Sequence, residues 1–164
     1  RVVSAVSDVS LYIEQPCETY EECRVVRDHS NHPMILDECM DSLQAVLRGH
    51  RDRAMDAINL KISRMGGLTK ARIIRDLCLG LGIIMTIEDT WGGEIADAAI
   101  AHLAHSTPAD MHFQSSAFHE YATHPIAQGG PVIRDGYMAM AATPGLGVEP
   151  DWDLLGEPIA SIAT

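Results

Sequence analysis

The sequence AINLKISRMGG, residues 57–67, decides the fold of this chain. It begins as a continuous apolar run, which is typical of a strand buried on both faces of a parallel sheet. It then reaches a lysine, Lys61, shortly before the pair Gly66 and Gly67. A lysine at the end of a buried strand lies either in solvent or at the mouth of a pocket, where it can act as a base. The other strand ends distinguish these two positions.

The same two-part unit, a short apolar run followed by an amphipathic segment, occurs five times along the chain. Successive units of this kind predict a parallel sheet with crossover helices on its outside. Residues after 130 form a tail rich in glycine and proline, with one predicted strand pair in residues 134–141. The predicted strands cover residues 9–16, 33–38, 57–63, 83–90 and, most weakly, 111–116.

Charged residues end the first four predicted strands at nearly even intervals: Glu14, Asp37, Lys61 and the pair Glu88 and Asp89. In a (β/α) barrel the carboxyl ends of all strands meet at one mouth, so these side chains would face one another across one pocket. An open doubly wound sheet usually carries a glycine-rich phosphate loop instead, and the sequence has none. The strand ends therefore predict a barrel.

The length of the chain accommodates only part of such a barrel. A whole TIM-type (β/α) barrel needs about 250 residues, whereas this chain has 164. We expect residues 1–130 to be the last five strand–helix units of an α/β barrel, followed by a tail in residues 131–164. The chain also starts at Arg1, without methionine, in a sequence typical of a helix end, which favours a fragment whose first strands lie upstream.

Composition and charge exclude several functions. The formal net charge of -11 and a pI near 5.0 would repel phosphate backbones and anionic surfaces, so we expect neither nucleic acid nor a membrane as a partner. No apolar run approaches the roughly 20 residues that span a bilayer. The four cysteines form no CxxC pair, so they are expected to be reduced thiols in a cytoplasmic protein.

Glu14 and Asp37 would provide hard, negative oxygen ligands at the mouth, the kind that Mg²⁺ prefers. Two carboxylates rarely complete a site, so a third is expected on an earlier strand. Lys61 beside a divalent cation would have its pKa lowered by like charge and partial burial, which suits a general base. The alternative is structural: each carboxylate caps a helix or pairs with an arginine, and Lys61 bridges to Glu14 or Asp37.

The segments IEQP, LDE, LKISRMGG and IEDTWGG, in this order, resemble the enolase superfamily, in its muconate lactonizing enzyme-like and mandelate racemase branch. The resemblance implies that Glu14 and Asp37 are metal ligands for Mg²⁺, that Lys61 is the acid/base lysine, and that Glu38 is a carboxylate behind the ligands. Members of this superfamily use a lysine or histidine base with Mg²⁺. A K-x-K pair, a first ligand aspartate and a capping domain, to which the tail would return, are expected upstream.

Within this branch, EDTWGG, AHLAHSTP and FQSSAF resemble enzymes of proline derivatives, namely cis-3-hydroxy-L-proline dehydratases and 4-hydroxyproline betaine 2-epimerases. The resemblance implies a cyclic amino acid substrate and removal of the proton alpha to its carboxylate, followed by loss of water in a dehydratase or by reprotonation in an epimerase. Glu88 and Asp89 would offer negative charge to the ring nitrogen. Phe118 stands where tryptophan is expected in the betaine enzyme, which favours the dehydratase.

Other hypotheses concern the remaining residues and the fragment itself. Trp91 packs either at a strand–helix corner or in the pocket. His102 and His105 are expected on a helix surface, and His119 could reach the mouth. A homo-oligomer is expected for the complete protein, and this chain alone is expected to hold metal poorly and to catalyse little. The non-catalytic alternative is an inactive barrel half, or interaction module, that self-associates through its open edges.

Overall fold

The structure, a computed structural model, describes residues 2–140 and 142–162. Its centre is a five-stranded sheet in which all strands are parallel and follow the order of the sequence. This arrangement confirms the predicted succession of strand–helix units. The strands are β1 Ile13–Glu14, β2 Met34–Leu36, β3 Ala57–Lys61, β4 Ile84–Glu88 and β5 His112–Ser115.

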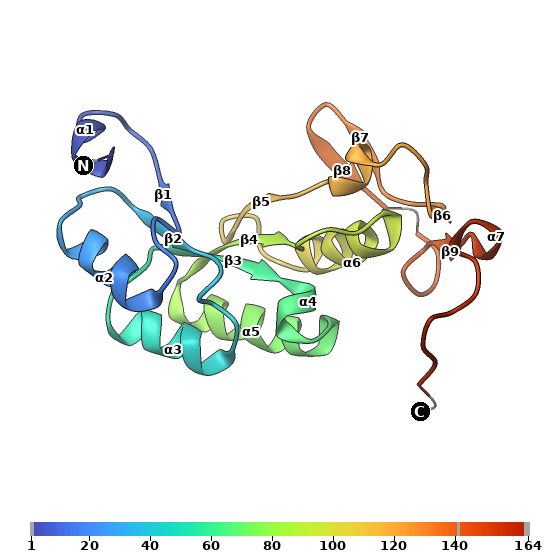
Figure 1. Cartoon of the computed structure of the whole chain (residues 1–164), viewed down its shortest axis with the longest axis horizontal. Helices are drawn as coiled ribbons and strands as arrows, with labels where there is room; N and C mark the ends of the chain where they lie inside the picture. Colours follow the sequence, from blue (N-terminus) through green and yellow to red (C-terminus); the bar gives the residue numbers. More distant parts are fainter. Residues whose placement is uncertain (1, 141, 163–164) are drawn as a thin grey trace.

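The crossover helices cover the outside of this sheet (Figure 1). Thr19 caps the first crossover helix through a capping box with Glu22, and Ser42 caps the next. Gly82, at φ 70, ends the longest helix in the left-handed region that glycine adopts readily. The helices are α1 Val2–Ala5, α2 Tyr20–Asp28, α3 Leu43–Arg51, α4 Ile62–Met65, α5 Leu68–Leu81 and α6 Glu94–His105.

The two faces of the sheet differ in chemistry. On β3 and β4, the apolar side chains of Ile58, Leu60, Met85 and Ile87 are completely buried in the hydrophobic core. Side chains alternate between the faces of a strand, so Asn59 shares the opposite face with the end of β3. That face carries the polar residues and forms the inside of the curved sheet.

An aromatic contact shows how strongly the sheet is curved. Tyr12, next to β1, and Phe113, in β5, belong to opposite edges of the sheet, yet their ring centroids are 5.0 Å apart. In a flat sheet the edges of five strands would be about 19 Å apart, four strand spacings, and side chains standing perpendicular to the sheet would not meet. The sheet therefore curls as part of a barrel.

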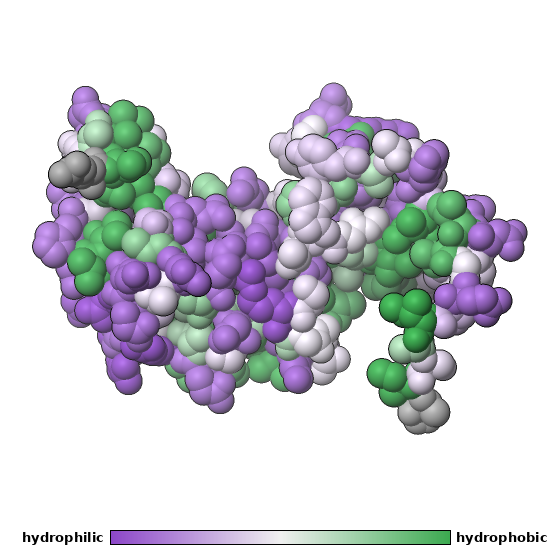
Figure 2. All heavy atoms as spheres, viewed as in Figure 1, coloured by the Kyte–Doolittle hydropathy of each residue, from purple (hydrophilic) through white to green (hydrophobic). Residues whose placement is uncertain are grey.

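The tail beyond β5 forms small, separate elements next to α6 (Figure 1). The predicted strand pair is confirmed as a hairpin, turning at Asp135 and Gly136, although residue 141 of the predicted stretch lies outside the described residues. Hydrophobic residues gather on the surface of the tail (Figure 2). Trp152 and Ile159 of the tail are exposed. The elements are η1 Phe118–Tyr121, β6 Ala127–Gln128, β7 Val132–Arg134, β8 Tyr137–Ala139, β9 Glu149–Pro150 and α7 Trp152–Leu155.

Two further observations concern the described residues as a whole. Among residues 2–140 and 142–162, no helix combines the length and the apolar character that crossing a bilayer requires. The four cysteines are free thiols.

Candidate active site

The ends of β2, β3 and β4 bring three charged side chains together. Lys61 pairs in register with Glu88 on the neighbouring strand, and its Nζ lies 3.4 Å from a Glu88 carboxylate oxygen. The same Nζ donates a 2.8 Å hydrogen bond to Oδ2 of Asp37. The Asp37 side chain is only 4% exposed, and those of Lys61 and Glu88 are 13% and 14% exposed. Lys61 is therefore at a partly enclosed strand-end cluster and not in bulk solvent.

Arg64 is a fourth member of this strand-end cluster, and the sequence analysis missed it. Its Nη1 lies 2.5 Å from Oδ1 of Asp37 and 2.8 Å from the backbone oxygen of the same residue. Arg64 lies in α4, three residues after Lys61, so one helical turn returns it to the same carboxylate. The K-x-x-R spacing of Lys61 and Arg64 could have indicated that both side chains reach the same carboxylate. Each oxygen of Asp37 thus faces one cationic side chain.

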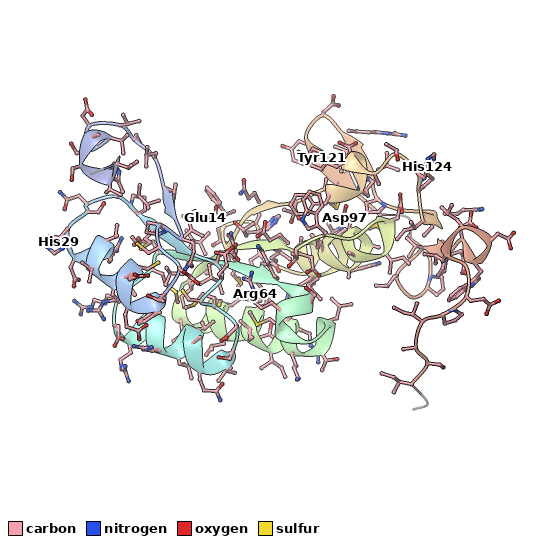
Figure 3. The ribbon with its side chains drawn as sticks, in the orientation of Figure 1. Glu14, His29, Arg64, Asp97, Tyr121 and His124 are labelled. Atoms are coloured by element: carbon pink, nitrogen blue, oxygen red, sulfur yellow. The ribbon has the colours of Figure 1, made fainter. Side chains whose placement is uncertain are left out.

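Glu14 is held close to this cluster through β3. Its Oε1 accepts a 3.0 Å hydrogen bond from the amide of Asn59, whose own Oδ1 is buried and has no hydrogen-bond partner among the residues that the structure describes. Asn59 and Lys61 are two residues apart and share one face of β3. Figure 3 shows Glu14 and Arg64 near the middle of the molecule, whereas His29, at the end of α2, lies at its periphery. Glu14 and Asp37 therefore contact neighbouring positions of one strand face.

The oxygen donors fit a hard divalent cation, but they are an incomplete set. Within the described residues, no group of three or more His, Cys, Asp and Glu side chains is placed to hold a metal ion. Glu14 and Asp37 offer carboxylate oxygens, the donors suited to Mg²⁺, and the side chain of Asn59, with its buried Oδ1, lies beside Glu14. Further ligands would have to come from outside these residues.

The electrostatics of the cluster reflect its mutual contacts. Burial tends to raise the pKa of Asp37, but hydrogen bonds from Lys61 and Arg64 lower it below the ordinary value. Burial tends to lower the pKa of Lys61, yet contact with Asp37 and the charge of Glu88 raise it overall. This direction is opposite to the one predicted beside a cation, because carboxylates surround the ammonium here. Burial raises the pKa of Glu88.

Asp89 and Glu38 do not join the cluster. Asp89 is buried, and its carboxylate accepts hydrogen bonds from the backbone N–H of Ser63, at 3.0 Å, from the Ser63 hydroxyl and from the N–H of Thr90. Both Asp89 oxygens are thus used to hold α4 against the end of β4, and a contact of Asp89 with the substrate stays a prediction. Glu38 is exposed and lines a shallow pocket with Gln15 and Cys17.

Three aromatic rings gather beyond the ends of β4 and β5. Trp91 follows β4, and its ring centroid lies 4.8 Å from that of Phe118, which follows β5. Tyr121 completes this aromatic group at 6.3 Å from Trp91 and 6.1 Å from Phe118. The rings of Trp91 and Tyr121 are largely exposed. Sequence reasoning selected Phe118, left Trp91 open between two positions, and missed Tyr121.

The histidines contact the tail rather than solvent alone. His102 and His105 of α6 donate Nε2 hydrogen bonds to the backbone oxygens of Leu146, at 3.1 Å, and Met138, at 3.2 Å. Both histidines thus lie at least partly exposed on α6, as expected, and in addition contact the tail. His119 instead pairs with Asp97 of α6.

Comparison with known proteins places these features in a family. Residues 1–154 match the family described as Enolase C-terminal domain-like. The chain belongs to this family, in its mandelate racemase and muconate lactonizing enzyme branch. The chain is 54% identical, over 98% of its length, to a cis-3-hydroxy-L-proline dehydratase from Roseibium aggregatum. It is also 31% identical, over 90% of its length, to an N-succinylamino acid racemase from Amycolatopsis.

Solved structures show the same likeness. A mandelate racemase/muconate lactonizing enzyme from Roseovarius nubinhibens matches 98% of this chain with a TM-score of 0.94 and 44% identity. An enolase superfamily member from the same organism, complexed with magnesium, matches 97% with a TM-score of 0.91 and 38% identity. The chain spans less than half of each of these relatives: 44% and 40% of the two sequences, and 43% of both structures.

Proposed function

We propose that this chain provides the carboxyl-terminal barrel strands of a Mg²⁺-dependent lyase. The lyase removes the alpha proton of a cyclic amino acid carboxylate and eliminates water, as a cis-3-hydroxy-L-proline dehydratase does. The observation that carries the proposal is the contact of Lys61 with Asp37 and Glu88 at the strand ends. The 54% identity to a dehydratase of that name supports the substrate class.

Glu14 and Asp37 would hold Mg²⁺ together with ligands from outside the described residues. The ion, when bound, supplies positive charge that stabilises the negative charge developing on the substrate carboxylate. In the structure, the carboxylate of Asp37 accepts hydrogen bonds from both Lys61 and Arg64. With Asp37 holding the ion, its hydrogen bond to Lys61 would be weakened, and the nearby positive charge would lower the pKa of the lysine. Lys61 then takes the proton at C2.

Glu88 and Phe118 would contact the ring of the substrate. Glu88 offers negative charge to the ring nitrogen, and Phe118 packs against the pyrrolidine ring. Asp89 contributes indirectly, because its hydrogen bonds to Ser63 fix the turn that follows Lys61. The tail, residues 131–164, would return to a capping domain, and its exposed Trp152 and Ile159 are suited to such a contact.

Replacement of Lys61 tests the proposal in the full-length protein. Lys61→Ala should abolish both dehydration of cis-3-hydroxy-L-proline and exchange of its C2 hydrogen in D₂O, with a loss of at least about 10³-fold in kcat, because the group that takes the C2 proton is removed. Lys70, the other lysine of the chain, is exposed and provides the control Lys70→Ala, which should retain wild-type rates. Full activity of Lys61→Ala would remove Lys61 from the mechanism.

The aromatic group supports a second candidate, a racemase or 2-epimerase of a proline betaine. Tryptophan and tyrosine faces attract a quaternary ammonium more strongly than phenylalanine alone, and Trp91 and Tyr121 flank Phe118. Product analysis separates the candidates. A dehydratase product has lost water, whereas an epimerase product retains its hydroxyl and gains one deuterium at C2 in D₂O.

A non-catalytic role is the third candidate. β1 and β5 each have one side without a strand partner within the described residues, and such edges favour association with another chain. Sedimentation of the 164-residue chain tests this candidate: a well-behaved monomer would contradict both self-association and the need for further barrel strands. Homo-oligomers and a reducing, cytoplasmic compartment remain proposals, the latter supported by four free thiols.

A further inference from the structure

Helix α6 carries a buried carboxylate, Asp97, whose hydrogen-bond partner, His119, follows β5. Asp97 is 1% exposed, and one of its oxygens, Oδ2, accepts two hydrogen bonds from His119: 2.7 Å from the backbone N–H and 2.6 Å from ring Nδ1. In residues 2–140 and 142–162, no other basic side chain forms an ion pair with Asp97. A buried charge without a partner is costly, so Asp97 depends on His119.

Glu94 makes a parallel contact one helical turn earlier. It is buried, and its Oε2 accepts a 3.0 Å hydrogen bond from the backbone N–H of Ile126. The side chain of Ile126 packs so closely on Gly93 that a Cβ at this glycine would lie 2.6 Å from it. Two carboxylates of α6 thus hold the two ends of the segment 119–126.

The segment between these anchors makes few contacts of its own. Residues 120–125 are exposed, and a segment with little burial moves readily unless its ends are fixed. It carries Tyr121, and Phe118 directly precedes it, so both rings depend on the anchor at His119 for their contacts with Trp91. In Figure 3, Asp97 and Tyr121 lie on the α6 side of the molecule.

We propose that Asp97 and His119 are a positioning pair that fixes Phe118 and Tyr121 against Trp91 beyond the ends of β4 and β5. The pair sets the affinity for the substrate ring and leaves proton transfer by Lys61 unchanged. This inference rests on the proposed function for its kinetic part, and on the described contacts alone for its structural part. The donor at Nδ1 carries the effect, because it is the ring nitrogen that contacts Asp97.

Three replacements of His119 distinguish the contribution of Nδ1 from that of the rest of the ring. In His119→Asn the amide nitrogen takes the place of Nδ1, so the bond to Asp97 is retained. His119→Leu removes the donor at similar size, and His119→Gln moves the amide beyond the place of Nδ1. His124 is exposed and has no side-chain hydrogen bond among the described residues, so His124→Leu is the control.

The experiment measures kcat and KM of the full-length protein, together with hydrogen exchange of residues 118–126. His119→Leu should raise KM about tenfold, leave kcat within about threefold, and speed exchange in the segment about tenfold, because uniform substrate binding and local order are lost. His119→Asn should stay within about threefold of wild type in all three quantities. If His119→Leu does not fold, His119→Gln gives the same comparison.

The other outcomes contradict either the positioning pair or the proposed function. If His119→Asn is as impaired as His119→Leu, the effect depends on the whole imidazole ring and not on the donor at Nδ1. The proposal that Asp97 and His119 are a positioning pair would then be wrong. Unchanged KM and exchange in His119→Leu would also contradict it. If exchange responds as expected but no proline derivative is turned over by the wild type, the proposed function fails while the anchoring of the segment stands.

Discussion

The strand-end cluster and the tail are held together in different ways. Lys61, Asp37 and Glu88 come from neighbouring strands, so the register of the sheet brings them together. The strands of the tail are only two or three residues long, and α6 also fixes the tail through side chains that each bind one distant backbone group, such as His102 with Leu146. The first region is supported by the buried core, whereas the second is held by short strand pairs and single side-chain contacts.

Removing Asp37 should produce the largest effect. Asp37→Ala leaves Lys61 and Arg64 without their shared buried partner, and breaking such a pair costs about 3 kcal/mol. Urea unfolding of the full-length protein measures this loss of stability. The pair of Arg24 and the exposed Asp28, 3.9 Å apart, provides the control: Asp28→Ala should cost less than about 1 kcal/mol. Equal costs would contradict the contrast between an enclosed cluster and a surface pair.

Replacing Arg64 tests whether its charge competes with a metal ion for Asp37. Arg64→Met removes a positive charge that competes for Asp37, so the affinity for Mn²⁺, used as a spectroscopic substitute for Mg²⁺, should rise about tenfold. Electron paramagnetic resonance of the full-length protein gives the dissociation constant. Arg72, exposed on α5 and without an ion pair among the described residues, provides the control Arg72→Met, which should leave the affinity unchanged. Weaker binding by Arg64→Met would mean that Arg64 orients Asp37 instead.

Loosening the tail should have a smaller and more local effect. His102→Leu removes the hydrogen bond to Leu146, and such a bond contributes about 1 kcal/mol. Hydrogen exchange around residue 146 should accelerate while kcat stays within about threefold of wild type. His50→Leu, at an exposed position of α3, is the control. A large loss of activity would show that the tail and the strand-end cluster are coupled.

The pH dependence of stability should be the smallest effect. Contacts with Lys61 and Arg64 lower the pKa of Asp37 below 3.8, although burial opposes them. Asp37 therefore contributes stability that is present above its unfolded pKa and is lost as the pH falls through the lower folded value. Asp37→Asn should flatten the decline of the unfolding free energy below about pH 4. A decline as steep as in the wild type would assign it to other carboxylates.

The sequence allowed the fold and the centre of the site to be predicted, because strand ends of a parallel barrel share one mouth. Lys61, Asp37 and Glu88 follow from that rule. Arg64 and Asp89 do not, since their roles depend on how the short helix α4 turns after β3. Asp97 and His119 lie in two different elements, 22 residues apart, and no repeating sequence pattern connects them. Their pairing could therefore not be predicted from the sequence.

Metal binding by the full-length protein tests the central claim most directly, namely that the strand ends share one cation. Mn²⁺ titration of the wild type should show one tight site per chain, and Glu14→Gln and Asp37→Asn should each weaken it by at least about a hundredfold, because each loses a charged oxygen ligand. Glu18→Gln, at an exposed acidic position close to β1, should bind as the wild type does. Unchanged binding by either ligand variant would contradict the shared site.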